Sequence, residues 1–170
     1  LSCFEENRAR IDVFFNIVDD PIFDRVTRSG DGWYLISHAG NIFEVSTNGD
    51  EINISDSWSV LPDDEEGWRP GGRNEIITAH QDLGLIYVLM HEGGVDTHHE
   101  NGTEIWVLDA NTQRRIHRLE LDTPAASLTV TQEDEPKLIV SGGGTHIYNA
   151  LTLIHERSIQ LPGASHYEDF

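Results

Sequence analysis

The sequence predicts an all-β protein built from repeated four-stranded antiparallel units, and three observations carry that prediction. Short apolar runs rich in branched and aromatic residues recur along the 170-residue chain, and such runs between turn signals are typical of strands covered on both faces. Asn-, Asp- and Gly-containing turns follow these runs at matching places. The whole plan of strand, loop, strand, turn and alternating strand occurs three times.

The central unit, residues 84–121, shows the plan most clearly. Its two apolar runs are Leu85–Met90 and Ile105–Leu108. The segment Asp109–Thr112 supplies a turn, because Asp and Asn side chains accept hydrogen bonds from the backbone just after them. Residues Arg115–Leu121 then alternate polar and apolar, which predicts a strand with one solvated face.

The units before and after align with this one. The equivalent positions are Ile42, Ile105 and Ile147, which lie 63 and 42 residues apart. Each unit is also expected to begin with a short strand, at Asp24–Thr27, Glu75–Ala79 and Ser127–Thr131. A repeat of about 40 to 50 residues with four strands indicates the blades of a β-propeller.

The predicted division gives a blade remnant over 1–20, blades over 21–57, 74–122 and 123–161, and a tail over 162–170. A propeller closes with at least about four blades. Three to four blades would leave unpaired sheet edges. We therefore expect this sequence to be part of a longer propeller, or to complete itself by association.

Composition excludes some classes of partner. Thirty acidic side chains against 11 basic ones give a formal net charge of -19. Binding nucleic acid or an anionic membrane surface requires a basic surface, so neither is expected. No apolar run approaches the roughly 20 residues of a membrane span, so membrane insertion is not expected. The lone Cys3 is either a small hydrophobic residue in a strand or half of a disulfide.

Residues 58–72 are expected to form a functional loop, because they combine an acidic run with tryptophans, prolines and glycines. Within it, Trp68, Arg69 and Pro70 are the candidate partner-binding residues, since Trp and Arg often anchor interfaces. The alternative is structural: Trp68 covers the top of a blade and Arg69 pairs with an acidic residue at 63–65.

Other polar groups predict no site. The insert His91–Glu100 is rich in His and carboxylate, which are normal metal ligands, but nothing positions them, and a solvated loop is favoured. The glycines at 142–144 lack a following helix and the phosphate-binding pattern, so they predict a tight turn. His80 and Asp82 form no recognisable nucleophile–base arrangement. No catalytic, cofactor-binding or metal-binding residue is assigned.

Three segments together resemble a known family. They are the GWRPGG sequence at Gly67–Gly72, the strand at Leu85–Leu89, and Glu104–Thr112 with its V-L-D-A-x-T turn. In this order they resemble the C-terminal half of the heavy (beta) subunit of the bacterial amine dehydrogenases, namely methylamine dehydrogenase and its aromatic-amine relative. GWRPGG is the more specific motif, whereas many propellers share the turn.

The resemblance implies a seven-bladed periplasmic propeller that assembles with a second heavy chain and a small light (alpha) subunit. The light subunit of the family carries tryptophan tryptophylquinone, oxidises primary amines to aldehyde and ammonia, and passes electrons to a small copper protein. The heavy chain is a scaffold, so this chain alone is expected to be inactive. The family's heavy-chain cysteine pair is represented here only by Cys3. The repeat pattern by itself also allows a non-catalytic protein-binding propeller.

Overall fold

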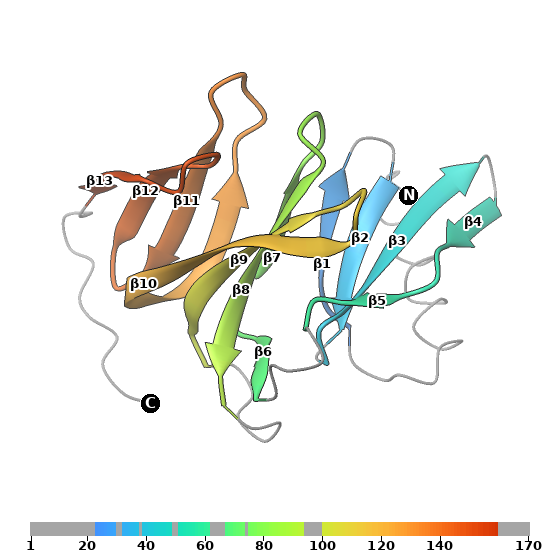
Figure 1. Ribbon diagram of the computed structural model, residues 1–170, viewed down its shortest axis with the longest axis horizontal. Helices are drawn as coiled ribbons and strands as arrows, with labels where there is room; N and C mark the ends of the chain where they lie inside the picture. Colours follow the sequence, from blue (N-terminus) through green and yellow to red (C-terminus); the bar gives the residue numbers. More distant parts are fainter. Residues whose placement is uncertain are drawn as a thin grey trace, which may run out of the picture.

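The computed structural model is all-β, with thirteen strands in two antiparallel sheets and no helix in the part of the chain it describes (Figure 1). The described residues are 23–29 (backbone), 32–37, 39–48, 51–61, 67–73, 75–93 and 100–159. None of these forms a helix of the length and hydropathy that a membrane span requires.

The first sheet is a meander of consecutive strands. Its order is β1 (Phe23–Ser29), β2 (Gly32–Ser37), β3 (Asn41–Asn48) and β4 (Glu51–Ile54), and β5 (Trp58–Ser59) also pairs with β3. The first sheet thus consists of four consecutive antiparallel strands, with β5 as an addition.

The second sheet contains the other two units. Its strands are β6 (Trp68–Pro70), β7 (Ile77–His80), β8 (Leu85–Glu92), β9 (Gly102–Asp109), β10 (Arg114–Val130), β11 (Lys137–Gly142), β12 (Thr145–Asn149) and β13 (His155–Ile159). Each strand from β7 onward pairs with the next along the chain, and β6 pairs with β8 beyond the end of β7. The division of the chain into units at particular residues stays a prediction.

Strand β10 corrects the sequence prediction, which placed two separate strands at 115–121 and 127–131. The backbone instead stays extended between them, and one long strand passes from one unit into the next (Figure 1). Its first part pairs with β9 and its last part with β11, with a register shift between Glu120 and Ala125. The strand thus serves as the fourth strand of one unit and the first strand of the following one.

The second and third units are joined where the segment that precedes β7 meets β10. The amide of Arg73 donates to the carbonyl of Ala126 at 2.8 Å, and the amide of Leu128 donates to Glu75 at 2.8 Å. Farther out, the hydroxyl of Tyr87 on β8 donates to the carbonyl of Ala150 at 3.1 Å. Burial raises the pKa of Tyr87 to about 12. These bonds fix the second unit against the third.

The core lies on both faces of β8 and β9. Every side chain from Ile86 to Met90 is fully buried, and so are Ile105, Trp106 and Leu108. This confirms the prediction that the two apolar runs are strands covered on both faces. Burying one large aliphatic side chain stabilises a fold by about 1.5–3 kcal/mol, so these two strands contribute strongly to stability.

The predicted repeat of the turn is also confirmed. Asp109 Oδ1 accepts hydrogen bonds from the two amides two and three residues on, at 2.8 and 2.9 Å. Asn149 Oδ1 does the same, at 3.0 and 2.9 Å. Each turn ends on a residue in the left-handed region, Gln113 at φ 56° and Leu153 at φ 58°. Two units thus use the same side-chain chemistry at the same place.

Gly142 provides a test of the close contact between β10 and β11. A Cβ added there would lie 2.3 Å from the carbonyl oxygen of Pro124 and 3.0 Å from Ala125 Cα. Because both are backbone atoms that cannot rotate away, Gly142→Ala should lower the free energy of unfolding by about 1–3 kcal/mol, measured by urea denaturation.

Gly143→Ala is the matched control. Its Cβ would meet only a methyl group of Thr123, at 3.3 Å. An equal loss of stability in both variants would show that backbone crowding at Gly142 is not the cause.

Candidate functional site

The sequence predicted that the candidate partner-binding segment lies in a loop. In the structure it forms the short strand β6. Trp68, Arg69 and Pro70 pair with the C-terminal end of β8. Pro70 has no amide hydrogen to donate, and proline is tolerated in sheets at edge strands. Sequence reasoning missed this strand because it has only three residues, one of them proline, among turn-forming residues.

Two glycines let the chain leave β6 and continue into β7. A Cβ on Gly71 would lie 2.6 Å from His91 Cβ, and Gly72 has φ +138°, which favours glycine. The amide of Gly71 still donates to the carbonyl of Leu89 at 3.1 Å. The last two glycines of GWRPGG are therefore required by close packing on β8 and by backbone conformation.

Burial differs among the three candidate residues. Arg69 is only 4% exposed, and Pro70 is buried as well. Trp68 is half-buried. Of the three, Trp68 is therefore the residue with side-chain surface left for a partner. The proposed pairing of Arg69 with residues 63–65 falls outside the described part, and partner binding by the three residues stays a prediction.

Trp68 belongs to an aromatic–arginine cluster, which we define as Trp68, Trp106, Glu104, Arg115 and Arg118. The two indole rings lie 5.4 Å apart between centroids. The Arg115 guanidinium lies 4.3 Å from the centroid of Trp106, and that of Arg118 lies 4.9 Å from Trp68 and 5.3 Å from Trp106. Cation–π contacts of this kind stabilise by about 0.5–2 kcal/mol each.

Glu104 anchors the arginines of the cluster. Its two carboxylate oxygens each accept a hydrogen bond from Arg118 at 2.7 Å, and one also accepts from Trp106 Nε1 at 2.7 Å. Burial by itself would raise the pKa of Glu104. The hydrogen bonds from Arg118 and Trp106 and the nearby charge of Arg115 outweigh burial, so the pKa of Glu104 lies below its ordinary value.

The cluster was not predicted from the sequence. Trp106 and Arg118 become neighbours because β9 and β10 pair them directly, and the register is a property of the folded sheet. The usable signal was the alternation in Arg115–Leu121, which predicted the strand but not its partners.

The cluster makes a pH-dependent contribution to stability. Because the pKa of Glu104 is lower in the folded chain, this contribution is present above the ordinary pKa of 4.5 and is lost as pH falls through the lowered value. Glu104→Gln should therefore cost about 1–3 kcal/mol at neutral pH. The difference between wild type and variant should shrink in acid, as measured by urea denaturation from pH 7 to pH 3.

Glu120→Gln is the control, because Glu120 is exposed and lies opposite Glu104 across the same strand pair. If the two variants change stability alike at every pH, the cluster does not contribute in this way.

The histidine-rich insert is only partly described. His91 Nε2 contacts the carboxylate of Glu100. Residues 94–99 lie outside the described part, as do Cys3 and the acidic run at 63–66. His80 is 4% exposed and accepts a hydrogen bond from the amide of Leu83 at 3.4 Å, which is a structural role. Glycines 142–144 form the tight turn that was expected, with Gly142 N donating to Gly144 O at 2.9 Å.

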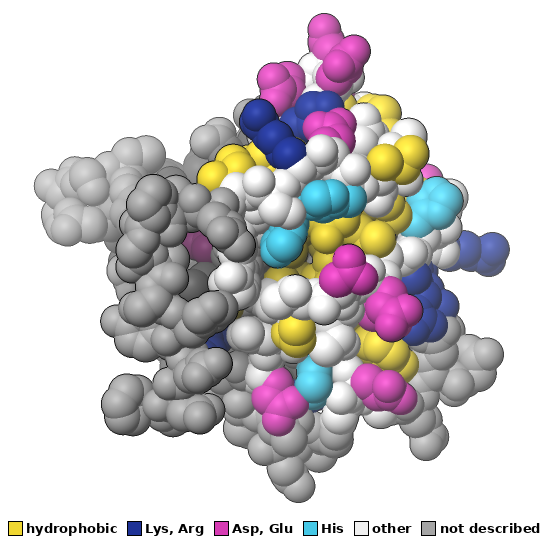
Figure 2. Space-filling view, turned by 90° about the vertical axis from the view of Figure 1, so that its left-hand side faces the viewer, with side chains coloured by type: hydrophobic (Ala, Val, Ile, Leu, Met, Phe, Trp, Pro, Cys, Tyr) yellow, Lys and Arg dark blue, Asp and Glu magenta, His cyan; other side chains and the backbone are white. Residues whose placement is uncertain are grey.

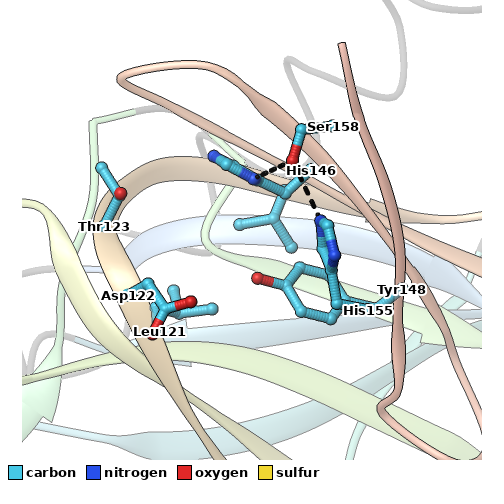
Figure 3. Close-up of a pocket in the computed structure, with 8 residues that line it drawn as sticks. Leu121, Asp122, Thr123, His146, Tyr148, His155 and Ser158 are labelled. Atoms are coloured by element: carbon cyan, nitrogen blue, oxygen red, sulfur yellow. Dashed lines mark hydrogen bonds between the residues drawn. The ribbon is translucent and has the colours of Figure 1, made fainter.

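A small cavity of about 120 Å³ lies beside β12 and β13. We call it the β12–β13 cavity. Two aliphatic side chains line it, those of Leu121 and Val140. The other six lining residues are Asp122, Thr123, His146, Tyr148, His155 and Ser158. Figure 3 shows the two imidazoles directed at the hydroxyl of Ser158. Sequence reasoning missed this site, because its residues come from four separate strands, β10 to β13.

Hydrogen bonds within the cavity connect three of these side chains. His146 Nδ1 lies 2.9 Å from Ser158 Oγ, and His155 Nε2 lies 3.0 Å from the same atom. The rings of Tyr148 and His155 meet edge to face at 5.2 Å. Burial and, second, the charge of Asp122 raise the pKa of Tyr148.

Over the described residues, neither His146 nor His155 bonds to a carboxylate that could orient it as a general base. Across that same part of the chain, no three His, Cys, Asp or Glu side chains are grouped so as to hold a metal ion. Repeated four-stranded antiparallel units define the class, which is a β-propeller.

The chain belongs to the methylamine dehydrogenase heavy chain family, whose profile matches residues 9–165. The heavy chain of Paracoccus versutus is 30% identical over 132 residues, which is 75% of this chain and 31% of that protein. The heavy chain of Methylobacillus flagellatus is 26% identical over 128 residues, or 73% of this chain and 32% of that protein. The chain thus spans about a third of the length of these relatives.

Solved structures resemble this chain in fold. Hydrazine synthase of Kuenenia stuttgartiensis aligns with 85% of this chain and 37% of its own, with a TM-score of 0.57 and 12% identity. Hsv2 of Kluyvelomyces marxianus aligns with 82% of this chain and 38% of its own, with a TM-score of 0.53 and 11% identity. At such identities the likeness concerns the fold alone. The predicted β-propeller and the predicted family are both confirmed.

Proposed function

We propose that this chain is part of the scaffold formed by the heavy subunit of a periplasmic amine dehydrogenase. That enzyme oxidises primary amines to aldehyde and ammonia and passes electrons to a small copper protein. The observation that carries the proposal is the family match over residues 9–165. The buried β8 strand and the glycine contacts that pack β6 against it support a rigid supporting role for the chain.

The cofactor implied by the family, tryptophan tryptophylquinone, is built from two linked tryptophans and supplies the quinone that accepts the electrons. The closely spaced pair in this chain, Trp68 and Trp106, does not fit that group. Trp106 is fully buried, so substrate could not reach it. Its indole nitrogen is occupied by Glu104. This misfit supports placing the cofactor on a separate light subunit.

The proposed task of this chain is to bind and hold the light subunit and a second heavy chain. Trp68 is the proposed contact, because part of its ring remains at the surface while Trp106 and Arg118 fix its position. A side chain already ordered in the unbound protein loses less conformational entropy on binding. Arg69 and Pro70, being buried, would support the shape of this contact.

The association test is light scattering of the purified chain, alone and mixed with a family light subunit. The proposal expects a defined complex with the light subunit, and amine oxidation only in the mixture. A chain that forms no complex, while the full-length heavy chain does, would place the contact elsewhere in the heavy subunit. Failure of both would favour the alternative of a non-catalytic binding propeller.

Trp68→Ala in the full-length heavy chain tests the contact itself. Loss of an interface tryptophan costs about 2 kcal/mol or more, so the dissociation constant of the light subunit should rise by about thirtyfold, as measured by calorimetry. Trp58→Ala, a half-buried tryptophan of the first sheet, is the control. Equal effects of the two substitutions would contradict a specific role for Trp68.

A further inference from the structure

The β12–β13 cavity is not used by the scaffold role. It lies in the last unit of the described chain, the side of the molecule that Figure 2 presents, where histidines lie beside hydrophobic and acidic side chains. Its distinguishing feature is the convergence of two imidazole nitrogens on one point, the hydroxyl oxygen of Ser158.

That convergence follows from strand pairing. His146 and Ser158 are opposite each other on β12 and β13, and Tyr148 is opposite His155. The register shift between Ile147 and Tyr148 brings His155 toward the same point, so that the two imidazole rings lie 5.9 Å apart between centroids. Backbone pairing of the two strands therefore holds one nitrogen of each ring within hydrogen-bond distance of Ser158 Oγ.

Ser158 is a replaceable partner for the two imidazoles. A hydroxyl has one hydrogen to donate, so it can satisfy one unprotonated ring nitrogen and must accept a hydrogen bond from the other. Ser158 is exposed, and rotation about its single side-chain bond would withdraw the oxygen from between the rings. Two nitrogen donors would then face a common position at the edge of the cavity.

We propose that His146 and His155 form a binding site for a divalent transition-metal ion of the imidazole-preferring class, such as Cu²⁺ or Zn²⁺. Imidazole nitrogen is a preferred ligand of these ions. Water would complete the coordination, since no third strong ligand is grouped with the pair in the part of the chain that the structure describes. A cavity of about 120 Å³ has room for it.

The surroundings favour a cation. Asp122 lines the cavity, and Figure 3 shows the hydroxyl of Tyr148 on the side of Asp122. Arg and Lys are missing from the cavity lining, so no fixed positive side chain of that lining opposes an ion. The net charge of -19 adds a general attraction for cations.

The test is titration of the purified chain with Cu²⁺ alone, followed by calorimetry and by electron paramagnetic resonance. The proposal expects one tight site with a spectrum of two nitrogen ligands. His146→Gln or His155→Gln should weaken that site by about tenfold or more, because each removes one of two strong ligands, and the double variant should lose it. Glutamine keeps a polar group near Ser158, and circular dichroism checks that each variant is folded.

Two further variants sharpen the outcome. Ser158→Ala should keep the site, because the hydroxyl only occupies the position between the rings. His98→Gln with His99→Gln should also keep it, because that pair belongs to the separate histidine-rich insert. The proposal is overturned if the double variant at 146 and 155 binds Cu²⁺ as tightly as wild type, or if the variant at 98 and 99 abolishes the tight site.

Discussion

Complete burial of β8 on both faces is the constraint on which the rest of the structure depends. Residues 86–90 have no solvent-facing side, so each face of the strand must be covered by another part of the chain. Its two edges are paired as well, with β9 on one side and β6 and β7 on the other. Strands β6, β7 and β9 of the second unit pair with β8 directly, and β10 pairs with β9.

Hydrogen bonds between the second and third units hold the second sheet together as one scaffold. The segment that precedes β7 exchanges backbone hydrogen bonds with β10, and the hydroxyl of Tyr87 donates to the carbonyl of Ala150 in the third unit. Strand β10 adds covalent continuity, because one extended segment belongs to both units. Displacing one unit would break bonds of the other, which suits a chain whose proposed role is to hold a partner subunit.

The aromatic–arginine cluster and the β12–β13 cavity have a common origin. Both arise where polar and aromatic side chains on adjacent strands are placed opposite each other by the register, Trp106 with Arg118 and His146 with Ser158. The first is closely packed and holds Trp68 at the surface. The second keeps a small open volume, which makes it the better candidate for binding an ion.

The sequence alone determined most of the strands, the turns at Asp109 and Asn149, and the family, because apolar runs, Asp and Asn turn residues and the GWRPGG motif are local signals. It did not determine that 68–70 pair with β8, that β10 is continuous, or which side chains meet across strands. Those features depend on register and on close backbone approach at residues such as Gly71 and Gly142. Such contacts join residues distant in sequence, so only the tertiary structure decided them.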